Sequence, residues 1–371
     1  MCLVLGSIHA FSVFLEPLES RFGTSRATAS LAYSFALVAL TAVVLLGPRI
    51  YGRFSASVLM AVSAAVAALG AIVAALAPSM IGVWVGYSLL FGAANGLGYG
   101  YGLQLAAHAN PGREGLAMGI VTAAYAVGAT LAPAAFLWAL GIAGFEGAMG
   151  LLAGALVLAG LGAVLCLRGR ALNLPISTTD TPHTDVATSR VVRLWVTYGA
   201  GVFAGLMIIG HAAEIARASG STALLWIAPT ALAVCNMGGS LIAGALADHV
   251  PGRLLQVGFV ALAGLALVWL TMTGVATQVL GAIGVVGFCY GGIIAATPAI
   301  IAKAHGMAEG PRLYGRVFTA WGVAGLAGPW LAGLMFDRTG SYEAAIWTAA
   351  ALSLMSALLA LSERSAVNGP R

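Results

Sequence analysis

Charged residues are scarce in this sequence. Asp, Glu, Lys and Arg together make up 8% of the 371 residues, and Lys303 is the one lysine. Soluble proteins carry about 25% charged residues, so this composition excludes an ordinary soluble domain. The net charge of +5 comes without any basic run, and we therefore expect no nucleic-acid binding.

Cysteines and catalytic motifs are also few. The four cysteines lie in apolar runs without the spacing of metal ligands, so we expect neither a disulfide nor a metal site. They are Cys2, Cys166, Cys235 and Cys289. The glycine-rich segment 96–102 (GLGYGYG) lies inside an apolar run and follows no strand, which excludes a phosphate loop. Because the sequence shows no nucleophile–base pair either, we expect no enzymatic activity, no cofactor and no ATP-driven step within this chain.

Hydrophobic residues, in contrast, make up 60% of the chain. They form apolar runs that mostly reach the length of about 17 to 25 residues that a membrane-spanning helix needs. The twelve runs are 1–15, 28–46, 55–76, 80–105, 116–138, 146–167, 191–213, 223–246, 254–273, 277–302, 316–336 and 343–361. The first run is short, since fifteen helical residues cover only about 22 Å. Either the protein starts upstream of Met1, or the first helix continues through Pro17. We expect no signal peptide, because a basic n-region and an A-x-A site are missing.

The basic residues lie mostly on one side of this topology. With both termini in the cytoplasm, the inner loops and the tail hold 13 of the 17 basic residues and the outer loops hold Arg21, Arg26, Arg217 and Arg338. The positive-inside rule therefore predicts a multi-pass protein of the inner (plasma) membrane with both termini cytoplasmic. The longest polar stretch, 169–190, predicts a cytoplasmic linker between two six-helix bundles, 1–168 and 191–371.

Several glycines indicate that the two bundles are copies. Gly52 and Arg53 recur at Gly252 and Arg253, an offset of 200 residues, and Gly115/Gly315 and Gly128/Gly328 share this offset. We therefore expect two parallel repeats of six helices.

A charged turn joins two apolar runs of the second half. Gly244, Asp248, Gly252 and Arg253 follow the pattern G-x-x-x-D-x-x-x-G-R, in which Gly252 permits a tight turn. The simpler interpretation is an ordinary charged helix–helix turn. The pattern resembles the loop between the second and third helices of each half of the major facilitator superfamily. In the first half the pattern is incomplete, since Pro48 stands where the aspartate is expected.

Longer segments strengthen this resemblance over nearly the whole chain. Segments 11–19 (FSVFLEPLE), 22–26 (FGTSR), 113–119 (REGLAMG), 205–216 (GLMIIGHAAEIA) and 328–342 (GPWLAGLMFDRTGSY) resemble the oxalate/formate antiporter and monocarboxylate transporter group. The resemblance implies an all-α integral membrane protein with the major facilitator fold: about twelve transmembrane helices in two pseudo-symmetric bundles. It further implies secondary active transport by alternating access, and we expect a monomer.

Two departures from this group concern fixed positive charges. Carboxylate carriers of the group resemble one another in a basic residue on the eighth helix and a lysine on the eleventh. Gly239 and Trp321 stand at these positions here. The resemblance therefore does not carry over oxalate or another dicarboxylate as the substrate.

Ionisable residues deep in a membrane are costly and therefore indicate function. His9 in the first run and His211 in the seventh are the candidates at depth, and they differ by only two positions at the offset of 200. We expect both to face the cavity and bind substrate, with His211, His9 and Glu214 carrying the coupling proton. The alternative is a neutral imidazole bonded to a neighbouring hydroxyl. Weaker candidates for the substrate site, which interhelical packing would also explain, are Tyr33, Asn95, Gln104, Tyr125, Asn236, Tyr290 and Trp321.

The charged turn at 244–253 suggests a gate, which here means a contact that locks one conformation. A carboxylate is disfavoured at the C-terminal end of its own helix and favoured at the N-terminus of another. We therefore expect Asp248 to contact the start of the eleventh helix near Gly315 and Arg316. Gating would involve Gly244, Asp248, Gly252, Arg253 and Arg316.

These observations favour a small organic anion, such as a monocarboxylate, moved by proton symport or anion exchange. A first alternative is proton-coupled export of neutral or lipophilic compounds, which Gly239 and Trp321 favour because they replace fixed cations. A second alternative is a transport-inactive sensor of the same fold.

Overall fold

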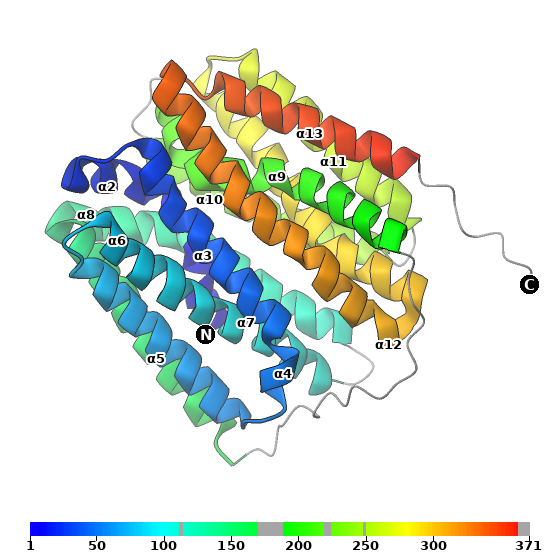
Figure 1. The fold of residues 1–371 in the computed structure, drawn as a ribbon, viewed down its shortest axis with the longest axis horizontal. Helices are drawn as coiled ribbons and strands as arrows, with labels where there is room; N and C mark the ends of the chain where they lie inside the picture. Colours follow the sequence, from blue (N-terminus) through cyan, green and yellow to red (C-terminus); the bar gives the residue numbers. More distant parts are fainter. Residues whose placement is uncertain (111–113, 170–187, 219–223, 248–249, 363–371) are drawn as a thin grey trace, which may run out of the picture.

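The computed structural model describes residues 1–110, 114–169, 188–218, 224–247 and 250–362, and every regular element among them is helical (Figure 1). The predicted linker therefore lies almost entirely outside the described residues. The elements are α1 (Cys2–Leu5), η1 (Gly6–Phe14), α2 (Leu15–Phe22), α3 (Arg26–Leu46), α4 (Pro48–Tyr51), α5 (Ala56–Ala75), α6 (Met80–Val83), η2 (Trp84–Phe91), α7 (Gly92–His108), α8 (Glu114–Leu167), α9 (Thr188–Ala218), α10 (Leu224–Ala247), α11 (Gly252–Thr271), α12 (Ala276–Thr339) and α13 (Glu343–Leu361).

The number of membrane spans agrees with the sequence prediction. Among the described residues, 11 helical stretches are long and apolar enough to cross a membrane. One of them, at 120–167, covers two predicted spans and is interrupted at Ala143 and Gly144. Gly144 has a φ of +61°, which residues with a side chain rarely adopt, and this glycine lets the chain turn between the two spans. The described helices therefore supply twelve spans.

The first span continues through Pro17 and ends at Phe22, which is one of the two alternatives that its short apolar run left open. Its middle, η1, is a 3₁₀ helix of nine residues, whereas such helices seldom exceed about four residues. Side chains of the fourth span bond to carbonyls in and before this irregular stretch. Asn95 Nδ2 donates to Leu5 O at 2.7 Å, and Tyr87 Oη donates to Ile8 O at 3.4 Å. The first span is therefore held in a non-α conformation around His9.

The two halves, residues 1–169 and 188–362, repeat a close helix contact. A Cβ atom at Gly128 on α8 would lie 1.6 Å from Leu3 O, so only glycine lets the fifth span approach the first this closely. In the second half, Gly328 on α12 packs on Met207 of α9, and a Cβ there would lie 3.3 Å from Met207 N. Spans five and one thus meet as spans eleven and seven do.

The halves meet each other mainly along α3 and the second part of α12, which lie side by side (Figure 1). Three glycines of α12 face α3 along most of its length: a Cβ at any of them would lie within 3 Å of an α3 atom. The pairs are Gly333 with Ala27, Gly325 with Leu37 and Gly322 with Thr41. A second contact joins α8 to α10, where Thr230 Oγ1 donates to Thr130 O at 3.1 Å.

Candidate functional site

Two polar clusters lie between the halves. The central cluster surrounds His9, whose Nδ1 lies 2.8 Å from Tyr33 Oη. The Tyr125 ring meets the imidazole edge-on, with ring centroids 5.6 Å apart. His9 keeps some accessible surface although rings from α3 and α8 flank it.

Asn95 holds this part of the central cluster in place. Its Oδ1 accepts a hydrogen bond from Tyr125 Oη at 3.0 Å, while its Nδ2 donates to Leu5 O at 2.7 Å. The amide is fully buried and therefore needs these partners. Asn95 thus orients both a ring that contacts His9 and the irregular backbone on which His9 stands.

The second half contributes Trp321 and Tyr290. Trp321 Nε1 donates to Tyr290 Oη at 2.8 Å, and the indole stacks on Phe318 with a centroid distance of 5.2 Å. Tyr290 lies near enough to Tyr33 and Tyr125 for a charge on one to act on the other. The structure therefore brings together six predicted side chains from the two halves: His9, Tyr33, Asn95, Tyr125, Tyr290 and Trp321.

Sequence reasoning missed two further tyrosines of this cluster. Tyr99 packs on Tyr125 with a centroid distance of 4.8 Å and interacts electrostatically with Tyr290 and with Tyr314. The signal for Tyr99 was its position one helical turn after Asn95, and that for Tyr314 was its position two turns before Trp321. Of the residues that the structure describes, no Asp, Glu, Lys or Arg makes a hydrogen bond or ion pair with the central cluster.

The other two uncharged candidates lie elsewhere. Asn236 takes part in packing between α10 and α12, where a Cβ at Gly291 would lie 2.0 Å from Asn236 O, and its Oδ1 accepts from Ser240 Oγ at 3.5 Å. Gln104 is exposed on α7. Neither residue contacts the central cluster.

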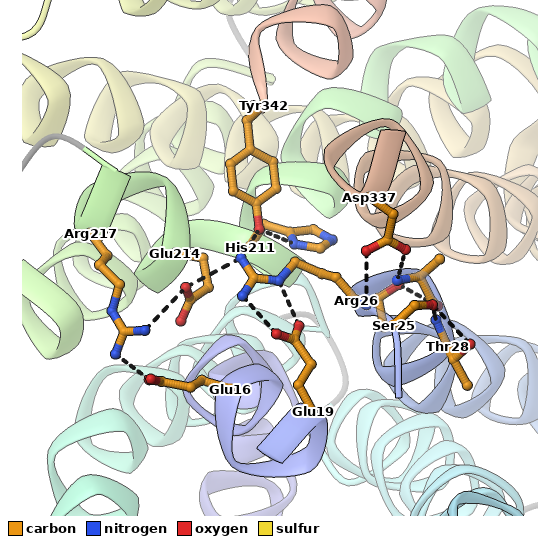
Figure 2. Close-up of polar contacts among 12 residues, drawn as sticks. Glu16, Glu19, Ser25, Arg26, Thr28, His211, Glu214, Arg217, Asp337 and Tyr342 are labelled. Atoms are coloured by element: carbon orange, nitrogen blue, oxygen red, sulfur yellow. Dashed lines mark hydrogen bonds and ion pairs between the residues drawn. The ribbon is translucent and has the colours of Figure 1, made fainter. Parts of the chain in front are cut away.

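The second cluster, which we call the Arg26 cluster, surrounds the first residue of α3 (Figure 2). Arg26 is 8% exposed, although the sequence analysis assigned it to an outer loop. Its Nε and Nη2 donate to the two carboxylate oxygens of Glu19 at 2.6 and 2.9 Å, a bidentate pair. Its Nη1 donates to Tyr342 Oη at 3.0 Å and lies 3.3 Å from Glu214 Oε2.

Local chain geometry places Arg26 there. Gly23, at a φ of +59°, ends α2 in the left-handed conformation, and Ser25 Oγ caps α3 by accepting from Thr28 N at 3.3 Å. The first backbone N–H groups of a helix lack partners within the helix. Asp337, near the end of α12 in the other half, accepts from Arg26 N at 3.0 Å and from Ala27 N at 2.9 Å.

His211 belongs to the Arg26 cluster and not to the central one. Its Nε2 lies 2.7 Å from Pro329 O, and because a carbonyl only accepts, Nε2 carries the hydrogen. Nδ1 therefore accepts from Tyr342 Oη, at 3.1 Å. Burial raises the pKa of Tyr342 above its ordinary value although Arg26 lowers it, so this hydroxyl keeps its hydrogen at neutral pH. The two predicted histidines are thus in separate environments, and no contact joins them.

A second ion pair joins the halves, with its arginine in the second half and its carboxylate in the first. Arg217 of α9 bonds to Glu16 of α2, and its Nη1 lies 3.7 Å from Glu214 Oε2 (Figure 2). Of this cluster, only His211 and Glu214 were predicted as site residues. For Glu16, Glu19 and Arg217 the sequence held a signal in a repeated spacing. The pairs Glu16/Glu19 and Glu214/Arg217 place charged residues three positions apart at the ends of the first and seventh spans.

The predicted gating contact of Asp248 lies outside the described residues. Its neighbours are described in part: Gly252 packs on Ile300, and Arg253 Nη2 donates to Leu361 O near the end of α13. Gly244 has open space around it and Arg316 is exposed. The roles predicted for these four residues therefore stay predictions.

Comparison with known proteins gives the family. A sequence model of the Major Facilitator Superfamily matches residues 1–276. The uncharacterized MFS-type transporter YhjX of Escherichia coli (strain K12) is 23% identical over 339 residues, which cover 87% of this chain and 82% of that protein.

Solved structures show the same fold at low sequence identity. The xylose transporter XylE from E. coli, in a partially occluded inward-open conformation, is 13% identical with a TM-score of 0.73, covering 96% of this chain and 94% of that one. A bacterial homolog of the human lysosomal transporter Spinster, inward-facing and occupied, is 13% identical with a TM-score of 0.76, covering 97% and 93%. The chain therefore belongs to the Major Facilitator Superfamily of membrane transporters.

Proposed function

We propose that this transporter moves a small, monocarboxylate-like organic anion by alternating access, in proton symport or in exchange for another anion. The observation that carries the proposal is the central cluster, where hydroxyl, imidazole, indole and amide groups of both halves converge. A site built from both halves lets one bound molecule sense their relative position, which alternating access requires.

The chemistry of the central cluster favours an anion over a cation. Tyrosine hydroxyls and a histidine N–H donate hydrogen bonds, and such bonds to a charged acceptor contribute about 1.5 to 3 kcal/mol each. A cation would need a carboxylate, and no described acid contacts these side chains. A bound carboxylate favours the protonated form of a neighbouring imidazole, so a carboxylate and a proton can bind together at His9.

The topology completes the proposal. We infer that the protein lies in the plasma membrane with both termini in the cytoplasm, so that the Arg26 cluster is at the outer end. Segments 1–168 and 191–371 then move as two bundles about the central cluster.

Uptake into proteoliposomes tests the proposed substrate class. We expect one or more monocarboxylates to enter faster when the external pH falls from about 7 to about 6, because proton binding and carboxylate binding favour each other in a symporter. His9→Gln should raise the KM about tenfold, the effect of losing about 1.4 kcal/mol of binding. His108→Gln is the matched control, because this histidine is exposed at the end of α7. Wild-type KM in the His9 variant would remove His9 from the site.

One observation favours a second candidate, the export of neutral or lipophilic compounds with protons. Trp321 stacks on Phe318 in the central cluster, where the related carboxylate carriers have a fixed cation. The substrate panel therefore includes neutral compounds, xylose among them because a solved neighbour is titled a D-xylose-proton symporter. Export of a neutral or lipophilic compound without carboxylate uptake would favour this candidate. Binding of a compound without its transport would favour the transport-inactive sensor.

A further inference from the structure

The Arg26 cluster holds more carboxylates than guanidinium groups. Among the described residues, four acids meet two arginines in it, and both arginines bridge the halves. The acids are Glu16, Glu19, Glu214 and Asp337, and the arginines are Arg26 and Arg217. Asp337 is compensated by the N-terminus of α3, a partial positive charge of about half a unit. One carboxylate therefore lacks a full counter-charge.

Distances identify that carboxylate as Glu214. Glu19 accepts two hydrogen bonds from Arg26 at 2.6 and 2.9 Å, and Glu16 accepts one from Arg217. Glu214 makes only longer ion pairs with the same two guanidinium groups. Its Oε2 lies 3.3 Å from Arg26 Nη1 and 3.7 Å from Arg217 Nη1. At 5% exposure it has little water to replace them, and an incompletely paired buried carboxylate favours its protonated form.

We propose that Glu214 takes up a coupling proton at the Arg26 cluster, besides the proton that binds with the substrate at His9, and that this proton loosens the contact between the halves. The proposal deepens the proposed function and rests on its proton coupling. In the step, a proton adds to Glu214 Oε2 and neutralises it, and the ion pair with Arg26 is lost. Arg26 keeps Glu19 within its own half, and Arg217 keeps Glu16 across the halves, so each guanidinium retains one carboxylate and the contact between the halves is weakened by one ion pair.

The geometry disfavours His211 as the proton acceptor in this conformation. Its Nε2–H is used by Pro329 O, and its Nδ1 accepts from Tyr342, whose oxygen in turn accepts from Arg26. A proton on Nδ1 would place a second positive charge close to Arg26, with only the Tyr342 hydroxyl between the two charges. His211 is therefore a positioning residue that orients Tyr342 toward Arg26.

A metal ion is not the favoured ligand of these acids. No group of three or more His, Cys, Asp or Glu side chains with the arrangement of a metal site occurs in the part of the chain that the structure describes.

The charged and titratable groups that face or surround Glu214 are Glu16, Glu19, Arg26, His211, Arg217, Asp337 and Tyr342. Because binding equilibria are reciprocal, a proton on Glu214 and an open Arg26 end favour each other.

Spin labels across the halves test this without any substrate. One label is placed at Ser20 in α2 and one at Ala344 in α13, both exposed, after the four native cysteines are changed to alanine. As the pH falls from about 8 to about 5, we expect the population with the labels far apart to rise about 5- to 150-fold, the usual size of such coupling. Glu214→Gln should give the low-pH distance distribution at every pH.

Glu146→Gln is the matched control. Glu146 pairs with Arg21 at 2.9 Å within the first half, so its loss removes an ion pair of this kind without untying the halves. It should keep the wild-type response. A Glu214→Gln distribution that still follows pH as wild type does would overturn the proposal. A Glu146→Gln variant that shows the low-pH distribution at every pH would overturn it as well. Lack of carboxylate uptake would instead contradict the proposed substrate and leave this measurement standing.

Discussion

Tyr342 connects the buried cation of the Arg26 cluster to His211. Its hydroxyl oxygen accepts from Arg26 at 3.0 Å, and its hydrogen is donated to His211 Nδ1 at 3.1 Å. Because burial raises the pKa of Tyr342 above the usual value of about 10, the stability that this group contributes is constant below about pH 10 and falls as the pH rises beyond it. Tyr342 therefore contributes no pH dependence between pH values of about 5 and 8.

Tyr342→Phe should destabilise the closed Arg26 end without removing its pH response. The change leaves the buried His211 Nδ1 without a donor, which costs about 1 to 3 kcal/mol. A lower Tm in detergent measures this effect, and the spin-label response to pH should persist. The control is Tyr101→Phe, since the buried Tyr101 hydroxyl has no hydrogen-bond partner among the described residues. An unchanged Tm in the Tyr342 variant would contradict the hydrogen-bond chain.

Between elements, a carboxylate of one half caps a helix of the other. Sequence reasoning expected a carboxylate at the start of the eleventh span, from Asp248. Among the described residues, the arrangement is found at α3, where Asp337 accepts from two backbone N–H groups. The rule that a carboxylate is favoured at a helix N-terminus therefore applies here. The pairing of Asp337 with α3 was not predictable, because the contact joins residues more than 300 positions apart.

Asp337→Asn should favour opening of the Arg26 end at every pH. The variant keeps one oxygen acceptor but loses the charge and the second acceptor, and helix caps contribute about 0.5 to 2 kcal/mol. We therefore expect the population with separated Ser20 and Ala344 labels to rise about 2- to 30-fold. Glu343→Gln serves as control, because Glu343 is an exposed acid at the start of α13. Equal populations in Asp337→Asn and wild type would show that the cap does not hold the halves together.

For the whole molecule, apolar run lengths were enough to predict twelve spans, because the bilayer sets one length for every span. The fold was predicted from the resemblance of the charged turn and of longer segments to the major facilitator superfamily. Much of the central cluster was also predictable from the sequence, since polar side chains such as His9 and Tyr125 stand out in apolar spans. The same reasoning missed Arg26, because a charged residue near a span end looks like a loop residue until partners from α2, α9 and α13 enclose it. The 3₁₀ conformation around His9 was equally hidden, since it depends on Asn95 and Tyr87 from another span.

Orientation in the membrane is the last prediction. The sequence prediction assigns four basic residues to the loops at the Arg26 end and the other 13 of the 17 to the opposite loops and the tail, so we expect the Arg26 end outside. Single cysteines at Ser20, beside Arg21, and at Ala109, after the end of α7, are exposed at opposite ends of the fold. In intact cells a membrane-impermeant maleimide should label position 20 and leave position 109 unlabelled until the membrane is opened. Labelling of position 109 alone would invert the topology and place the Glu214 proton site at the cytoplasmic end.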